Sequence, residues 1–381
     1  MSLSSPPRAE PKDARAKIEI IGAGVIGLTA ATRALARGAA VRLIAASDGI
    51  DANCCSWWAG GMLAPDCEME TAEPLIGALG RESMAYWAEH AAPPAAETGT
   101  LVVAPPRDAP ELRRFARRTS GGRMLEPEEI AALEPDLEGR FLQALFFETE
   151  ALMDPRRTLS AMLERLRRGG AEIMLKRRLG PAELSPDPAE EGWADLRFDC
   201  RGLAARDALA DLRGVRGEML IVRSREIRLS RPVRLLHPRS PIYILPRDEH
   251  LFMIGATMIE SEARGGAALR SLLELSAAAC ALHPAFAEAE LVEIGADARP
   301  AFPDNLPRVR RRGRTLYLNG AYRHGFLLAP ALARRALDWA LDGVACHAVC
   351  ERWEDGAWRG AEGGLEHEDR AHHDHSERGA A

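Results

Sequence analysis

The sequence predicts an α/β fold in which a discontinuous domain built on a parallel sheet is interrupted by a second, mostly antiparallel domain. The chain opens with a β-α-β pattern over residues 17–45. Helix and strand patterns alternate again near residues 155–215 and 299–345, and sheet-like segments lie between these regions. With 381 residues, the chain is long enough for two domains and can bury a large core without disulfides.

The opening β-α-β unit follows from hydrophobic periodicity. Residues 17–21 form a short apolar run that predicts a buried strand. Apolar residues at helical spacing from Val25 to Leu35 predict a helix that ends near Gly38, because glycine is favoured just after a helix C-terminus. Residues 40–45 form a second apolar run, and we expect the crossover between the two strands to be right-handed.

The remaining elements are predicted in chain order. Asp154 and Pro155 mark the start of an amphipathic helix over residues 155–168, because aspartate caps helices and proline suits their first turn. Other helices are expected at residues 81–92, 109–119, 128–133, 266–282 and 328–341. Strands are expected at residues 101–104, 142–148, 172–175, 193–199, 218–223, 241–245, 251–257, 291–298 and 315–319, with a polar loop at 180–191.

Composition and charge exclude several classes of partner. The chain is 46% apolar and 28% charged, which is typical of a globular protein. Its net charge is -6, from 50 basic and 56 acidic residues that are interleaved along the chain, so no nucleic-acid partner is expected. Because no segment reaches the roughly 18 apolar residues of a membrane span, no membrane partner is expected either.

The termini and the cysteines point to a cytoplasmic protein. Residues 1–16 lack the apolar core of a secretory signal and are expected to be a disordered leader, and residues 358–381 a disordered tail. The seven cysteines are odd in number and include no C-x-x-C pair, so we expect reduced thiols. Their spacing relative to histidines does not match a zinc site, and no metal is expected.

A glycine-rich turn, Gly22-x-Gly24-x-x-Gly27, lies between the first strand and the first helix. In this context Gly22 makes a tight turn, Gly24 lets the backbone approach a pyrophosphate, and Gly27 lets the helix pack closely on the strand. The helix N-terminus then directs N–H groups and partial positive charge toward the phosphates. The turn predicts a dinucleotide site, but by itself it does not distinguish NAD from FAD.

The acidic residue that usually binds the ribose at the end of the second strand is absent. That position reads Ala45-Ala46-Ser47, and Asp48 follows a few residues late. Either Asp48 replaces the usual acid, or Ser47 and the backbone hold the ribose. Asp48 is also a common type of turn residue.

A second glycine-containing loop indicates which dinucleotide cofactor the chain binds. The sequence Cys55-Ser-Trp-Trp-Ala-Gly60-Gly61-Met62-Leu63-Ala-Pro65 resembles the second flavin-contact loop of the D-amino-acid oxidase superfamily, and it is most similar to the glycine oxidases of thiamine biosynthesis. The resemblance implies FAD as cofactor. Residues 60–63 would then run beside the isoalloxazine ring, with glycines that permit close backbone approach.

Four more segments resemble the same family, and the resemblance covers residues 17–345. They are Arg216-Gly217-Glu218, the pair Tyr243–Arg247 and Gly255–Met258, Asp297-Ala298-Arg299-Pro300, and the loop from Asn319 to Pro330. The last implies flavin contacts from His324, Gly325, Phe326 and Leu327. The family fold implies a Rossmann-like FAD-binding domain over residues 17–85, 151–214 and 296–345, and a substrate domain over 86–150 and 215–295.

The resemblance also implies roles for four side chains. Arg299 would bind the substrate carboxylate, because a guanidinium holds two oxygens at once. Tyr243 would add a hydroxyl, Arg323 would stand near flavin or substrate, and Met258 would wall the pocket. Each side chain also has a plainer interpretation. Arg299 would be a surface arginine and Tyr243 a core aromatic residue. Arg323 would form a loop salt bridge, and Met258 would be a core methionine.

The expected activity is oxidation of the amine of glycine, or of a similar small amino acid, to the imine. Oxygen would be the acceptor and hydrogen peroxide a product, and iminoacetate would supply the thiazole of thiamine. Two alternatives stay open: an oxidase or dehydrogenase of another amine such as sarcosine, proline or a D-amino acid, and a non-catalytic flavin-binding partner subunit. The family also implies a homo-oligomer.

Overall fold

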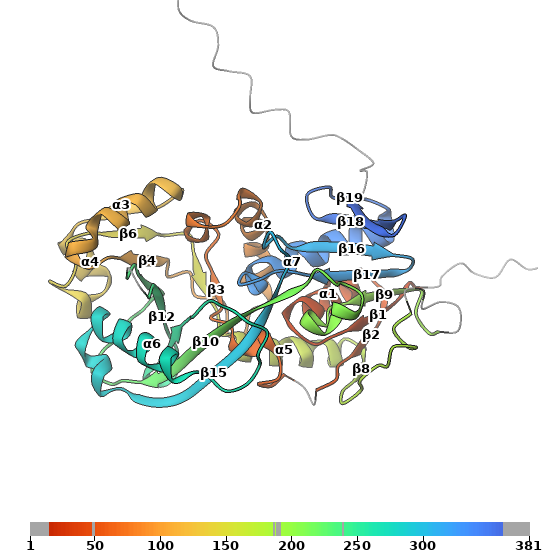
Figure 1. Cartoon of the computed structure of the whole chain (residues 1–381), viewed down its shortest axis with the longest axis horizontal. Coiled ribbons are helices and arrows are strands. Elements are labelled where there is room, and N and C mark those ends of the chain that lie inside the picture. Colours follow the sequence, from red (N-terminus) through yellow and green to blue (C-terminus); the bar gives the residue numbers. More distant parts are fainter. Residues whose placement is uncertain (1–14, 48–49, 186, 188–191, 238–239, 361–381) are drawn as a thin grey trace, which may run out of the picture.

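A computed structural model describes residues 15–47, 50–185, 187, 192–237 and 240–360 (Figure 1). Most of the expected leader (residues 1–14), Asp48, and the expected tail from residue 361 lie outside the described residues. The described part is an α/β structure with one largely parallel and one largely antiparallel sheet, which is the fold class that the sequence predicts.

The first sheet is eight-stranded among the described residues, in the order β19-β18-β16-β17-β9-β1-β2-β8. The strands β8, β2, β1, β9 and β17 are parallel neighbours, and β16 runs antiparallel to β17. Its strands are β1 (Lys17–Ile21), β2 (Ala40–Ile44), β8 (Glu172–Met174), β9 (Leu196–Asp199), β16 (Arg308–Arg312), β17 (Thr315–Asn319), β18 (Cys350–Glu354) and β19 (Ala357–Gly360).

The second sheet, nine-stranded among the described residues, is antiparallel except where β11 runs parallel to β4. Its longest strands, β10 and β15, pair along their whole length, and Figure 1 shows them running side by side from beneath the first sheet to the far end of the molecule. Its strands are β4 (Thr100–Val103), β5 (Arg123–Leu125), β6 (Ala144–Phe147), β10 (Arg213–Arg223), β11 (Val233–Leu235), β12 (Ile242–Pro246), β13 (Leu251–Gly255), β14 (Ile259–Glu260) and β15 (Glu290–Ala301).

Helices cover both sheets. Helix α1 packs against α5 and α7, and α2 packs against α7, beside the first sheet; α6 packs against strands of the second. A short ladder of β3 (Met62–Leu63) with β7 (Ala151–Leu152) lies apart from both sheets. The helices are α1 (Val25–Ala36), α2 (Pro74–His90), α3 (Ala109–Arg118), α4 (Pro127–Leu133), α5 (Pro155–Arg168), α6 (Leu269–Leu282) and α7 (Gly325–Leu337).

Several predicted boundaries differ from the structure. The expected tail begins too early, because residues 358–360 belong to β19, which forms a hairpin with β18. Asp355 and Gly356 both have positive φ angles at its turn, and Trp353 and Trp358 meet edge to face across it with ring centroids 5.0 Å apart. The helix expected at residues 81–92 begins at Pro74, and the strand expected at 218–223 begins at Arg213.

The first sheet brings three glycine-containing loops to one edge. Strands β1, β9 and β17 are parallel, so their carboxyl ends meet at the same side of the sheet. Gly22 follows β1, Gly202 follows β9 shortly after its end, and Gly320 follows β17. All three have positive φ angles. In open α/β sheets this edge is where ligands bind.

Candidate active site

The turn after β1 is fixed by close packing. Gly22 has a φ of +106°, and a Cβ atom there would lie 2.5 Å from the carbonyl oxygen of Cys200. A Cβ on Gly27 would lie 1.9 Å from the carbonyl oxygen of Gly22. Both glycines are therefore required for α1 to sit tightly against the ends of β1 and β9.

Gly24 is different, because a Cβ there would meet its nearest neighbour, Ser56 Oγ, only at 3.3 Å. It caps the N-terminus of α1 without a side-chain hydrogen bond, and Val25 N–H donates to Ser56 Oγ at 3.1 Å. The start of α7 lies close by, since a Cβ on Gly325 would be 3.6 Å from Val25 Cγ1. Two helix N-termini thus converge, which favours an anion such as a pyrophosphate.

The end of β2 carries no acid among the described residues at the usual ribose position. Ala45 is buried and its backbone is paired: its N–H donates to Met174 O at 2.9 Å, and its carbonyl accepts from Arg177 N at 2.9 Å. Ser47 O accepts from Lys176 N at 2.8 Å. A ribose contact from Asp48 or Ser47 stays a prediction.

The loop at residues 59–63 fits a flat ring that approaches its backbone. Gly61 has a φ of +76°, and a Cβ there would lie 2.2 Å from Met153 O. Met62 and Leu63 are fixed by pairing with Leu152 and Ala151. Gly61 is buried, yet its N–H donates to no described residue. Buried backbone donors are nearly always paired, so this N–H is available to a ligand or to water.

Arg299 lies on β15 beneath this loop region. Its Nη1 donates to Thr257 O at 3.2 Å, and its guanidinium lies over Gly217 of β10, where a Cβ would be 2.1 Å from Nη2. Among the described residues no carboxylate forms a salt bridge with Arg299. A guanidinium with free donors is suited to a carboxylate from outside the chain.

Tyr243 on β12 lies near Arg299. Its ring is 3.4 Å from where a Cβ of Gly60 would stand, and its hydroxyl lies over Gly255, 2.7 Å from a Cβ placed there. Burial raises the pKa of Tyr243, while the positive charge of Arg299 opposes that shift. The phenol is therefore protonated at neutral pH and able to donate.

Arg323 and Met258 also belong to this region and contact each other. Arg323 Nη1 lies 3.6 Å from Met258 Sδ, and the Tyr322 hydroxyl lies 3.4 Å from the same sulfur. Met258 is 55% exposed, so it is not a core methionine. Arg323 is already paired, since its Nη2 donates to Glu68 Oε2 at 2.6 Å and to Thr71 Oγ1 at 2.9 Å.

Glu68 is a site residue that the sequence analysis does not identify. It lies in the 3₁₀ helix η2 (Cys67–Glu70) and also pairs with Arg234 at 3.2 Å and faces His324 Nδ1 at 3.6 Å. Burial raises its pKa, but Arg323 and Arg234 outweigh burial and lower the pKa to about 2. Burial also lowers the pKa of His324 to about 4, so Glu68 is charged and His324 neutral near pH 7.

A second buried carboxyl, that of Glu150, binds the backbone at the start of η2. Glu150 Oε1 accepts from the N–H groups of Asp66 and Cys67 at 3.1 and 2.7 Å. Burial raises the pKa of Glu150 to about 8. Its other oxygen, Oε2, is buried with no hydrogen-bond partner, which fits a carboxyl that keeps its proton.

The first turn of α7 lies beside this region. Phe326 O accepts from Trp87 Nε1 at 2.7 Å, and Leu327 packs against Gly80. The side chains of Phe326 and Leu327 are thus buried in the core, so any cofactor contact from them is made by the backbone. His324 and Gly325 lie at the helix N-terminus itself.

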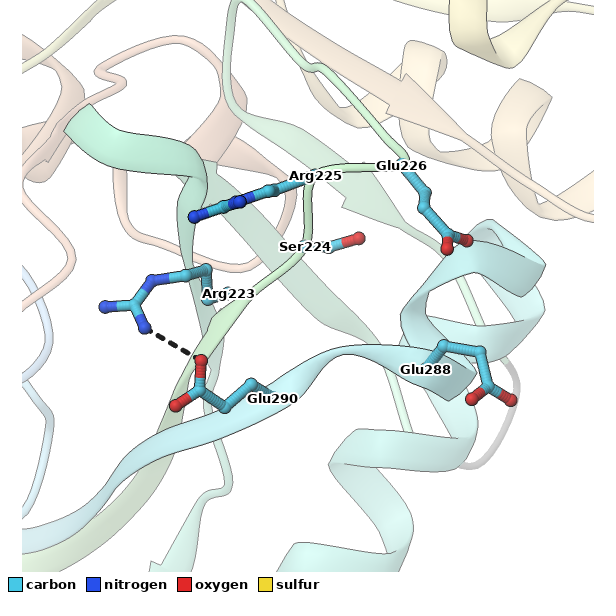
Figure 2. Close-up of a pocket in the computed structure, with 6 residues that line it drawn as sticks. All are labelled: Arg223, Ser224, Arg225, Glu226, Glu288 and Glu290. Carbon is cyan, nitrogen blue, oxygen red and sulfur yellow. Dashed lines mark hydrogen bonds and ion pairs between the residues drawn. The ribbon is translucent and has the colours of Figure 1, made fainter.

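Two hollows among the described residues can be placed relative to this site. One, of about 260 Å³, lies where β10 and β15 end, and Figure 2 shows Arg223 pairing with Glu290 there. Arg223 lies eight residues along β10 from Val215, the residue that pairs with Arg299. At ~3.4 Å per residue, this separation is about 27 Å. The other, of about 510 Å³, lies between the loop at residues 57–59, the start of α5 and the β12–β13 turn.

Comparison with known proteins identifies the family. The model of the DAO family, FAD dependent oxidoreductase, matches residues 17–339. A Rhizobium etli protein, named as a candidate thiamine biosynthesis oxidoreductase, ThiO, is 51% identical over 317 residues, which is 83% of this chain and 94% of that protein. The chain belongs to the DAO family of FAD-dependent oxidoreductases.

Solved structures of the DAO fold agree with this assignment. The glycine oxidase of Bacillus cereus is 22% identical with a TM-score of 0.72, over 86% of this chain and 98% of that one. The L-proline dehydrogenase of P. horikoshii is 16% identical with a TM-score of 0.70, over 86% and 94%. Across the described residues of this DAO-family chain, no helix is both long and apolar enough to cross a bilayer.

Proposed function

We propose that this chain binds FAD and oxidises the amine of glycine, or of a similarly small amino acid, to the imine with production of hydrogen peroxide. The observation that carries the proposal is Arg299, a guanidinium that no described carboxylate pairs, beside Tyr243, whose ring lies against Gly60. A substrate carboxylate would complete this arrangement.

FAD suits the residues that are present. The converging N-termini of α1 and α7 would hold its pyrophosphate, and the backbone at residues 60–63 would line its ring. When bound, FAD supplies a two-electron acceptor for the hydride of the substrate Cα–H bond and lets oxygen take up the electrons as hydrogen peroxide.

Two side chains would orient the substrate. Arg299 and Tyr243 would bind the carboxylate, which leaves the amine and Cα facing the loop at residues 60–63. No carboxylate or histidine is needed as a base if the amine enters neutral. Burial lowers the pKa of His324 to about 4, which makes it a weak base, and Glu68 is held in salt bridges by Arg323 and Arg234.

The pairing of Arg323 favours a small substrate with one carboxylate. Because Glu68 forms a salt bridge with Arg323, Arg299 is the cation nearest Tyr243 that has no carboxylate partner among the described residues. The name of the Rhizobium relative supports a role in thiamine biosynthesis, where iminoacetate would be the useful product. The residues do not favour a non-catalytic partner subunit, which would have no physical need for an unpaired arginine at this place.

A substrate panel tests the proposal. Hydrogen peroxide formation should be measured with glycine, sarcosine, D-alanine and L-proline, each in air and with an artificial electron acceptor. Glycine should give the highest kcat/KM and should form peroxide in air. Turnover only with the artificial acceptor would replace the oxidase assignment with a dehydrogenase, and preference for L-proline would overturn glycine as the substrate.

A further inference from the structure

Arg247, which follows β12, makes an unusual set of contacts. Its Nη2 donates to the carbonyl oxygen of Gly60, Nη1 lies 3.4 Å from Pro246 O, and Nη2 lies 3.9 Å from Met253 Sδ. No described carboxylate forms a salt bridge with it. Arg156 and Arg157 line the same 510 Å³ hollow, but each is paired, with Glu293 and Asp248.

Arg247 is half-buried, and burial lowers its pKa while the charges of Asp154 and Asp248 oppose that shift. A partly buried guanidinium is favourable only when its donors are used. Here the strongest acceptor is a single backbone carbonyl in the flavin-contact loop. Arg247 is therefore placed to act on that loop through its hydrogen bond to the Gly60 carbonyl.

The peptide between Gly60 and Gly61 links Arg247 to the candidate cofactor site. This bond is trans, since the described cis bonds are at Ala92-Pro93 and Gly255-Ala256. In a trans peptide the carbonyl and the N–H point in opposite directions. Arg247 holds the Gly60 oxygen, so the Gly61 N–H must point away from Arg247.

We propose that Arg247 is a positioning residue that fixes the Gly60–Gly61 peptide and presents the Gly61 N–H to an acceptor atom of the bound flavin. The inference rests on the proposed binding of FAD. A cation bonded to the carbonyl also polarises the peptide and strengthens its N–H as a donor. Both effects would act on how tightly FAD is held and on the energy of its ring.

The test compares Arg247→Met, which keeps an unbranched apolar stem, with Arg247→Lys, which keeps the charge. Arg157→Met is the matched control, because Arg157 lines the same hollow but pairs with Asp248 at the surface. Three properties are measured: the Kd for FAD added to FAD-free protein, the visible spectrum and midpoint potential of bound FAD, and the Tm of the FAD-free protein.

Arg247→Met should weaken FAD binding by about tenfold or more, equivalent to about 1.4 kcal/mol. It should also lower the midpoint potential, because the Gly61 N–H would be less well placed and a weaker donor to the reduced ring. Arg247→Lys should recover part of both effects, and Arg157→Met should match the unaltered protein. The FAD-free Tm of Arg247→Met should stay close to that of the unaltered protein.

Two results would overturn the inference. One is FAD binding, spectrum and potential that are unchanged in Arg247→Met. The other is a large fall in FAD-free Tm with an unshifted potential in both Arg247 variants, which would make the residue a structural tie. If the unaltered chain binds FAD but does not oxidise glycine, only the proposed substrate fails; if it takes up no FAD, the proposed function and this inference fail together.

Discussion

Replacing Arg299 with alanine removes a cation that has no carboxylate partner among the described residues and that would bind the substrate carboxylate. In the structure Nη1 is used by Thr257 O, at 3.2 Å, and the remaining donors are free for two oxygens. Each hydrogen bond to a charged group contributes about 1.5–3 kcal/mol, so losing two costs about 3–6 kcal/mol. At about 1.4 kcal/mol per tenfold, kcat/KM for glycine should fall by roughly 10²–10⁴.

The assay compares glycine with glycinamide, which lacks the carboxylate. The alanine variant should lose far less activity toward glycinamide than toward glycine, and its FAD content and spectrum should be unchanged. Arg213→Ala is a suitable control, because Arg213 pairs with Glu260 at the surface of β10. An equal loss toward both substrates, or loss of FAD from the Arg299 variant alone, would refute this role.

Three further changes have defined outcomes. Tyr243→Phe should lower kcat/KM for glycine by about ten- to a hundredfold through one lost hydroxyl contact, with FAD content unchanged; no effect would remove Tyr243 from the site. Gly27→Ala should lower the Tm and the FAD content, because its Cβ would lie 1.9 Å from Gly22 O, whereas Gly265→Ala, in open space, should not. The pKa of Glu150 is raised to about 8 from an ordinary value of 4.5, so its contribution to stability is full below pH 4.5 and is lost as pH rises through 8. Glu150→Gln should therefore flatten the fall in Tm between those pH values. An unchanged dependence of Tm on pH would contradict the raised pKa.

The parts of the fold with strong local signals could be predicted from the sequence. Strand β1 and helix α1 follow from apolar periodicity and glycine placement, and the Asp154 cap of α5 is present, with Asp154 Oδ1 accepting from Arg157 N at 3.0 Å. Strand β16 was not predicted because its sequence, Arg308-Val-Arg-Arg-Arg312, looks like a solvated basic run. Its arginines are accommodated by partners distant in sequence, such as Asp211 and Glu351.

The candidate site also contains some residues that the sequence reveals and others that it does not. Glycines 22, 24, 27, 60 and 61 carry a conformational or packing signal that is legible in sequence, and the structure brings Tyr243, Arg299, Arg323 and Met258 to one place. Glu68 carried no such signal, because an acid three residues after a proline resembles a surface turn. Its importance comes from Arg234 and Arg323, which lie 166 and 255 positions away along the chain.

Anaerobic mixing of the FAD-loaded protein with glycine tests the central claim most directly. The account predicts that the visible absorption of the flavin bleaches on addition of glycine. When air is admitted, the absorption should return and hydrogen peroxide should form in proportion to the flavin reduced. A flavin that stays oxidised with excess glycine, or a purified chain that takes up no FAD, would contradict the account.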